Sequence, residues 1–312
     1  MEEGLQRRSV MYKRILVATG GSPWSDAAVA YAIRLAAGTG AEVCILSVLT
    51  IPVSYGIPEA GMEFDMLIDS VEQEGKERLL KAATYATRAG VAYTTRLTWG
   101  NIPATILQTA DAEACELIIL GSRGLTGWKR LMLGSISNMV TAKASQPVLI
   151  VKQHPTGAPG TPLWRRVLVA TGDSAWSDAA VEHAVRLAHA MQLEICFLHV
   201  VRTRGPRGDT PAALEGQESL VLAEARAAAA GLVSNATLGA GDIVRTILDT
   251  ATTKQCDAIV MGSRGLTGWK RLMLGSIAGA VAATAVLPVL IVKHGEPTAG
   301  TGGGVTGTPH EL

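Results

Sequence analysis

Residues 121–136 and 262–277 both read GSRGLTGWKRLMLGSI. Each copy follows a short apolar run and precedes a stretch that suits a helix, so the pattern is a strand, a glycine-rich loop and a helix. Because a glycine-rich turn into a helix aligns free backbone amides, such a segment suits the binding of an anion. The two copies therefore indicate both the fold class and a candidate site.

These segments belong to a longer internal duplication. RILVATGGSPWSDAAVAYAIRLA at 14–36 corresponds to RVLVATGDSAWSDAAVEHAVRLA at 166–188. A chain of 312 residues is long enough for two domains, each with its own core. The predicted organisation is a first domain at 10–152, a linker at 153–163, a second domain at 164–294 and a disordered, Gly- and Thr-rich tail at 295–312.

Short apolar, β-branched runs alternate with longer helical patterns in both halves, which is typical of βα units around a parallel sheet. The strands are expected near 14–19, 42–48, 92–98, 116–121 and 147–152, and near 166–171, 193–200, 232–238, 257–262 and 288–293. In the first half, helices are expected near 24–38, 65–89, 101–113 and 134–145. The predicted fold class is α/β, with two open, doubly wound domains of five parallel strands each. Ligands of such sheets bind beyond the carboxyl ends of the strands.

Composition and charge limit the classes of partner and the location that the chain could have. The formal net charge is +1, so no global field recruits nucleic acid or an anionic membrane, and neither is expected as a partner. The uncharged stretch 272–292 is long enough to span a bilayer, but Gly275 and Pro288 interrupt it, which favours a buried helix and strand. The four cysteines include no CxxC motif and are expected to be buried and reduced. The N-terminus lacks an apolar segment of signal-peptide length, so a cytoplasmic location is expected.

The repeated segment has the spacing Gly-x2-Gly-x9-Gly-Ser. Gly121 and Gly124 end a strand and let the backbone approach a ligand without a Cβ in the way. Gly134 and Ser135 open the next helix, where free amides, the positive end of the dipole and a hydroxyl favour a phosphate. The aromatic, basic loop 128–130 could fold over the charged end of the ligand. The alternative is an ordinary helix start after a tight turn, with solvated basic residues. The second copy repeats the motif at Gly262, Gly265, Gly275 and Ser276.

This motif, with the strand-one starts and the final Pro-Val-Leu-Ile-Val strands, resembles the universal stress protein family in its tandem form, over about 14–152 and 166–293. The resemblance implies flavodoxin-like domains, of the adenine nucleotide alpha hydrolase-like type, that bind ATP or the related AMP or ADP, with Mg as an optional companion. It also implies that the two domains pack as a pseudo-dimer through their last strands, 147–152 and 288–293. Whether two chains then form a homodimer is left open.

In such proteins the phosphates lie on the glycines and serine of the motif, and the adenine lies near the ends of the first two strands. No catalytic and no metal-ligating residue is expected. The expected nucleotide-binding residues are Thr19, Gly20, Val48, Gly121, Arg123, Gly124, Gly134, Ser135 and Ser137 in the first half, and Thr171, Gly172, Val200, Gly262, Arg264, Gly265, Gly275 and Ser276 in the second.

Two departures from the family pattern make the halves unequal. The family commonly has Asp-Gly-Ser after strand one, whereas this chain reads GGS at 20–22 and GDS at 172–174. The acidic residue near the nucleoside is therefore missing from its place, although Asp173 could substitute one residue later. The second departure is Ser137, whose counterpart is Ala278. One lost hydroxyl–phosphate hydrogen bond weakens binding by about 1–2 kcal/mol, so the first half is expected to bind more tightly.

No dedicated catalyst is evident in the sequence. It contains no Gly-x4-Gly-Lys-Ser/Thr P-loop, and no histidine recurs at the same place in both halves. Asp26 and Asp178 recur, but they stand at the start of a helix, where stabilisation of the helix dipole explains them. Efficient hydrolysis is therefore not expected.

Three functions remain open at this point. The first is a nucleotide-binding switch or sensor with at most slow hydrolysis, and the second is a scaffold of the same fold that binds no nucleotide. The third is a transferase or hydrolase of a related α/β superfamily. Arg123 and Arg264 either contact phosphate or a partner, or form surface ion pairs. Trp24 and Trp176 either cap the nucleoside or, as we expect, pack under the first helix.

Overall fold

A computed structural model of the chain describes residues 11–51, 62–123, 133–156, 161–201, 210–264 and 274–294. Its strands are β1 Arg14–Ala18, β2 Glu42–Leu49, β3 Tyr93–Trp99, β4 Leu117–Gly121, β5 Val148–Val151, β6 Arg166–Thr171, β7 Glu194–Val201, β8 Ser234–Ala240, β9 Ala258–Gly262 and β10 Val289–Val292. Its helices are α1 Pro23–Thr39, α2 Met62–Arg88, α3 Ile102–Ala112, α4 Ser135–Lys143, α5 Ala175–Met191, α6 Thr210–Ala229, α7 Ile243–Thr253 and α8 Ser276–Thr284. The expected strands and their alternation with helices are confirmed, with strand ends displaced by one or two residues at most.

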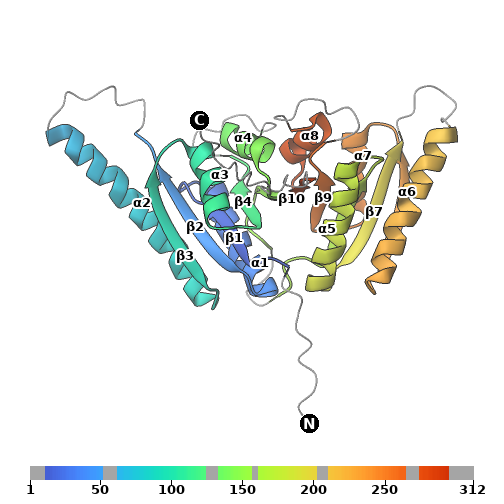
Figure 1. Cartoon of the computed structure of the whole chain (residues 1–312), viewed down its shortest axis with the longest axis horizontal. Coiled ribbons are helices and arrows are strands. Elements are labelled where there is room, and N and C mark those ends of the chain that lie inside the picture. Colours follow the sequence, from blue (N-terminus) through green and yellow to red (C-terminus); the bar gives the residue numbers. More distant parts are fainter. Residues whose placement is uncertain are drawn as a thin grey trace, which may run out of the picture.

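All of these strands form one ten-stranded sheet, in the order β3-β2-β1-β4-β5-β10-β9-β6-β7-β8. Neighbouring strands within each half are parallel. At the centre β5 and β10 pair antiparallel, with Leu149 opposite Leu290. The predicted pairing of the two halves through their last strands is therefore confirmed, and Figure 1 shows the resulting two-winged arrangement.

Helices cover both faces of the sheet, as continuous apolar strands require. On one face α1, α2, α5 and α6 contribute to a single apolar core that runs through both halves. On the other face α3 and α4 cover the first half, and α7 and α8 cover the second, over two separate cores. All four cysteines are buried in these latter two cores, Cys44 and Cys115 in one and Cys196 and Cys256 in the other.

The helix α1 illustrates how the sequence sets the ends of these elements. Ser22 caps the N-terminus, because its hydroxyl oxygen accepts a hydrogen bond from the Ser25 N–H, and Pro23 occupies the first helical position. Gly40 ends the helix in the left-handed conformation, with φ of 77°. Helix α5 begins in the same way at Ser174. The repeated Ser-x-Trp-Ser-Asp sequence therefore leads the backbone of each half from its first strand into a helix that packs on the sheet.

The linker between the halves is held by Arg34 of α1. The Arg34 guanidinium donates to the carbonyl oxygens of Thr156, Thr161 and Pro162, at 2.5, 3.0 and 3.3 Å respectively. The linker is thereby tied to the first half on both sides of residues 157–160, which the structure does not describe.

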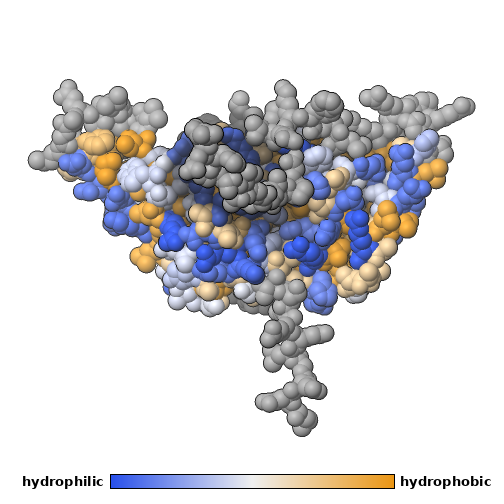
Figure 2. Space-filling model, in the orientation of Figure 1, coloured by the Kyte–Doolittle hydropathy of each residue, from blue (hydrophilic) through white to orange (hydrophobic). Residues whose placement is uncertain are grey.

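The outermost helices leave apolar side chains exposed. Met66, Leu80 and Tyr85 lie exposed on α2, and Leu214 and Leu222 on α6. Figure 2 shows apolar patches on these two flanks and mainly hydrophilic side chains on the central part of the same face. Within the described ranges, none of the helices combines the length and the apolar character that crossing a bilayer demands.

Candidate functional site

The strand order creates a topological switch point in each half, between β1 and β4 and between β6 and β9, where ligands of open α/β sheets bind. The chain leaves β1 toward β2 on one side and leaves β4 toward β5 on the other, so the two connections diverge at the carboxyl ends of these strands. Thr19 follows β1 and Gly121 ends β4, while Thr171 and Gly262 occupy the same places in the second half. The structure therefore brings the two predicted groups of site residues to one edge of the sheet.

Gly121 has a structural reason for lacking a side chain. A Cβ at this position would lie 2.6 Å from the backbone carbonyl carbon and oxygen of Trp24, in the first turn of α1. At Gly262 a Cβ would lie 2.6 Å from the Trp176 carbonyl oxygen. The space is thus occupied by the first helix, so these glycines allow close helix packing. The expected reason, open room for a ligand, does not apply at these two positions.

Two backbone hydrogen bonds carry the chain from β4 to the start of α4. The Ser122 N–H donates to the Val151 carbonyl oxygen at 2.7 Å, and the Gly134 N–H donates to the Ser122 carbonyl oxygen at 2.8 Å. The second half repeats this arrangement through Ser263 and Gly275. A Cβ on Gly275 would lie 3.0 Å from the Ser263 carbonyl oxygen, so glycine lets the helix start close to the strand end.

Gly134 and Gly275 are the N-caps of helices α4 and α8, and a glycine has no side chain with which to cap the first-turn amides. Among the residues that the structure describes, these two helix starts have no side-chain cap. Ser135 and Ser276 follow at the first helical position and are exposed. The first amides of a helix have no partner within the helix, and they carry the positive end of its dipole. This part of each site is therefore suited to a phosphate group, as the motif predicts.

Ser137 and Ala278 occupy equivalent places but do different things. The Ser137 hydroxyl is buried and donates to the Gly121 carbonyl oxygen at 2.6 Å, which ties α4 to the end of β4. Ala278 cannot make this bond to Gly262. The Ser137 hydroxyl proton is donated to this carbonyl oxygen and is not directed at a ligand. The hydroxyl therefore supports the site by fixing α4 in place. This differs from the direct phosphate contact expected from the sequence.

An arginine that follows β4 or β9 lies over an aromatic ring at the start of the first helix of its half. The Arg123 guanidinium carbon is 5.9 Å from the centre of the Trp24 ring, and that of Arg264 is 5.8 Å from the Trp176 ring. His294 packs edge-on against Trp176, with ring centres 6.0 Å apart. In each half, the arginine and the tryptophan thus form one cation–aromatic pair. The sequence gives no sign that these two positions are in contact.

The residues expected around the nucleoside lie at the ends of the first two strands of each half. Thr19 is buried and its N–H donates to the Leu46 carbonyl oxygen at 2.8 Å, and the Thr171 hydroxyl donates to Leu198 at 3.2 Å. Val48 and Val200 are half-buried near the ends of β2 and β7.

The two turns after strand one have different backbones. Nothing lies within 4 Å of where a Cβ would stand on Gly20 or on Gly172, but Gly20 is exposed whereas Gly172 is half-buried. Gly21 has φ of 76°, in the left-handed region, whereas its counterpart Asp173 does not have a positive φ. The Asp173 side chain is exposed rather than directed into the core.

Sequence reasoning missed Lys152 and Lys293. Each follows the final Pro-Val-Leu-Ile-Val strand of its half, where burial and, after it, the charge of Arg123 or Arg264 lower its pKa. The repeat of these lysines is visible in the sequence, because both halves read PVLIVK. Their partners lie in the opposite half, however, and no sequence pattern indicates that.

The acidic residues shared by the two halves are engaged in ion pairs. Asp26 pairs with Lys81 at 2.6 Å and Asp178 with Arg226 at 3.2 Å. Glu42 and Glu194 pair with Arg14 and Arg166, the arginines that begin β1 and β6. Among the described residues, no group of three or more His, Cys, Asp or Glu side chains is arranged to hold a metal ion.

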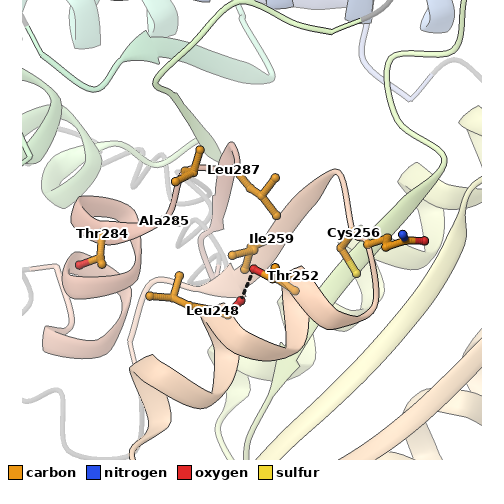
Figure 3. A pocket seen from close by; sticks show the side chains of 10 residues that line it. Leu248, Thr252, Cys256, Ile259, Thr284, Ala285 and Leu287 are labelled. Carbon is orange, nitrogen blue, oxygen red and sulfur yellow. Dashed lines mark hydrogen bonds between the residues drawn. The ribbon is translucent and has the colours of Figure 1, made fainter.

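A cavity of about 380 Å³ lies in the second half, away from the candidate nucleotide site. It is formed between α7, the end of α8 and the start of β10, and Figure 3 shows that its lining is mainly apolar. Leu248, Ile259 and Leu287 line it together with Cys256. Ile259 and Leu287 lie near the amino ends of β9 and β10, so the cavity is separate from the candidate site at the carboxyl ends of the strands.

Some predicted site residues lie outside the described part of the chain. These are Gly124, Gly265 and the basic loop 128–130 with its second-half counterpart. Their contribution to the site stays a prediction.

Comparison with known proteins agrees with the duplicated architecture. The chain matches the profile of the Universal stress protein family over residues 11–152 and 163–293. A universal stress protein of Mycolicibacterium smegmatis is 26% identical over 291 residues, which cover 89% of this chain and 96% of that protein. One from Methanocaldococcus jannaschii is 34% identical over 143 residues, which cover 46% of this chain and 84% of that protein.

A solved structure extends the likeness to both halves together. The crystal structure of a universal stress protein from Archaeoglobus fulgidus superposes with a TM-score of 0.69 at 26% sequence identity. The superposition covers 92% of this chain and 97% of that chain.

Proposed function

The chain belongs to the universal stress protein family, and we propose that each half binds an adenine nucleotide, ATP or the related ADP or AMP, as the signal of a stress-response switch. The observation that carries this proposal is the start of α4 and α8 at a Gly-Ser pair, with a glycine at the N-cap, beside the ends of β4 and β9. A helix start of this kind, at the point where the strand connections diverge, favours a phosphate.

The charges near the ends of β4, β5, β9 and β10 agree with an anionic ligand. Arg123 lies close enough to Lys152 to act on its charge, and Arg264 acts on Lys293 in the same way. At the nucleoside end, Gly20 and Gly172 stand where the family pattern has an aspartate, so no carboxylate is present at these two positions. Binding in this chain therefore depends on the phosphates more than on the nucleoside, and affinity should rise from AMP to ATP.

Under this proposal, hydrolysis of the bound ATP is slow or absent. Asp26 and Asp178, the acidic residues in the first turns of α1 and α5, are held in ion pairs with Lys81 and Arg226. A general base must reach the attacking water with its proton-accepting atom free. A magnesium ion would have to be held by the nucleotide and water, because the described residues offer no carboxylate cluster for it.

The competing proposal is a scaffold that keeps the fold and binds no nucleotide, and the missing acid at Gly20 and Gly172 favours it. Thermal melting with and without ATP separates the two. Saturation at about a hundred times the dissociation constant should stabilise a one-site binder by roughly 2.7 kcal/mol. An unchanged melting temperature, with no adenine compound released from the purified protein on denaturation, would favour the scaffold.

A further inference from the structure

Two lysines join the halves in a reciprocal way. Lys152 follows β5 and its Nζ donates to the Ala283 carbonyl oxygen, 2.5 Å away, in the last turn of α8. Lys293 follows β10 and its Nζ donates to the Thr141 carbonyl oxygen in the last turn of α4. Each ammonium thus contacts the C-terminal turn of the other half's helix, where the dipole favours a cation.

Each lysine also lies beside the arginine of its own half. Burial, together with the charge of Arg123, lowers the pKa of Lys152 to about 8. Burial and Arg264 lower the pKa of Lys293 to about 8 in the same way. No carboxylate among the described residues contributes to either environment. A phosphate placed beside such an ammonium is a stronger acceptor than a backbone carbonyl, because the hydrogen bond then joins two opposite charges.

The backbone places Lys152 next to the anion site of the first half. Val151, which directly precedes it, accepts the Ser122 N–H, and the Ser122 carbonyl oxygen accepts the N–H of Gly134, the N-cap of α4. The opposite helix, α8, begins at the anion site of the second half and ends at the Lys152 contact. Each of these nine-residue helices therefore spans from one site to a lysine that borders the other.

We propose that Lys152 and Lys293 couple the two nucleotide sites. When a nucleotide occupies one half, the lysine of that half exchanges the carbonyl of the opposite helix for a phosphate. The exchange removes a cation from the end of α8 or α4, and so weakens the helix whose start holds the other phosphate. Occupancy of one half then lowers the affinity of the other by about fivefold. This coupling rests on the proposed function.

Hydrogen exchange of the full chain, followed by mass spectrometry with and without ATP, tests the coupling, with calorimetry on the same samples. In the unmodified chain, ATP should speed exchange in the last turns, 140–143 of α4 and 281–284 of α8. In Lys152→Met, the 281–284 turn should exchange fast without ATP and respond no further, while the 140–143 turn keeps its response. Lys152→Arg keeps the cation and should restore the response at 281–284. Lys143→Met, which removes an exposed lysine, should leave that response unchanged.

The outcomes separate the two proposals. No heat on ATP addition would refute nucleotide binding and the coupling with it. Heat without any change of exchange in the two last turns would leave nucleotide binding standing and overturn the coupling alone, as would a normal response at 281–284 in Lys152→Met. If Lys152→Met does not fold, Lys293→Met read at 140–143 gives the reciprocal test with the same criteria.

Discussion

Tyr12 and His183 meet across the boundary between the two halves, with the Tyr12 Oη 2.7 Å from the His183 Nε2. The equivalent place in the duplicated structure holds Trp164 and Tyr31, whose ring centres lie 6.5 Å apart. Both contacts pack two rings together, since the Tyr12 and His183 ring centres lie 5.8 Å apart, and the Tyr12–His183 contact adds a hydrogen bond between the side chains. Burial raises the pKa of Tyr12 and, together with Arg186, lowers the pKa of His183 to about 4.

The His183 contact should make stability depend on pH. Because the folded-state pKa lies near 4 and the unfolded value near 6.5, the unfolded chain binds the extra proton between these pH values. Stability from this group is full above about pH 6.5 and is lost as the pH falls toward 4. Urea denaturation at pH 5 should show a loss of about 1–2 kcal/mol relative to pH 7.5 from this group.

His183→Phe removes the titrating group and should flatten this part of the pH profile. His189, exposed on the same helix, provides the control through His189→Gln, which should keep the profile of the unmodified chain. Equal pH profiles for His183→Phe and the unmodified chain would rule out His183 as the source.

Gly121→Ala should destabilise the first half through packing against α1. The added Cβ would meet the Trp24 backbone at 2.6 Å, and a backbone cannot move aside as the end of a flexible side chain can. Overpacking of this kind costs about 1–3 kcal/mol, measured by urea denaturation. Gly20→Ala is the control, because nothing lies within 4 Å of its Cβ, and it should change stability by about 0.5 kcal/mol or less. Comparable losses in the two variants would contradict this explanation.

The fold could be predicted largely because buried parallel strands are continuous apolar runs and because the duplication repeats each signal. Val148–Val151 and Val289–Val292 are examples, since every residue in both is buried. The candidate site was predicted less fully. The role of Gly121 depends on how closely α1 approaches β4, and that of Lys152 on a carbonyl in the other half. Such contacts are set by tertiary packing, so local sequence patterns do not contain them.

Ser137→Ala should weaken both the first half and its ligand site. Its hydroxyl donates a hydrogen bond to the half-buried end of β4, and the substitution leaves the Gly121 carbonyl oxygen without this donor. A lost hydrogen bond of this kind costs about 1–2 kcal/mol of stability. If α4 then shifts, ATP affinity of the first half should fall by about five- to tenfold in calorimetry. The reverse exchange, Ala278→Ser, should narrow the difference between the halves. Tighter binding by the second half in the unmodified chain would contradict the predicted order.

A carboxylate at the first position of α4 and α8 should separate nucleotide binding from stability. Ser135 and Ser276 are exposed there, so glutamate fits without repacking, and a negative charge favours the N-terminus of a helix by about 0.3–1 kcal/mol. The doubly substituted chain, Ser135→Glu with Ser276→Glu, should therefore melt at or slightly above the temperature of the unmodified chain.

The same charges should abolish ATP binding, because the carboxylates occupy the positive end of the helix that a phosphate needs and repel it. Calorimetry should show no ATP heat for this chain, and melting with ATP should show no shift. Met139→Glu adds one negative charge to an exposed position further along α4 and should retain binding. ATP binding of undiminished affinity in the doubly substituted chain would place the phosphates elsewhere. Loss of binding without loss of stability would assign them to the helix starts, since a general unfolding effect could not produce that combination.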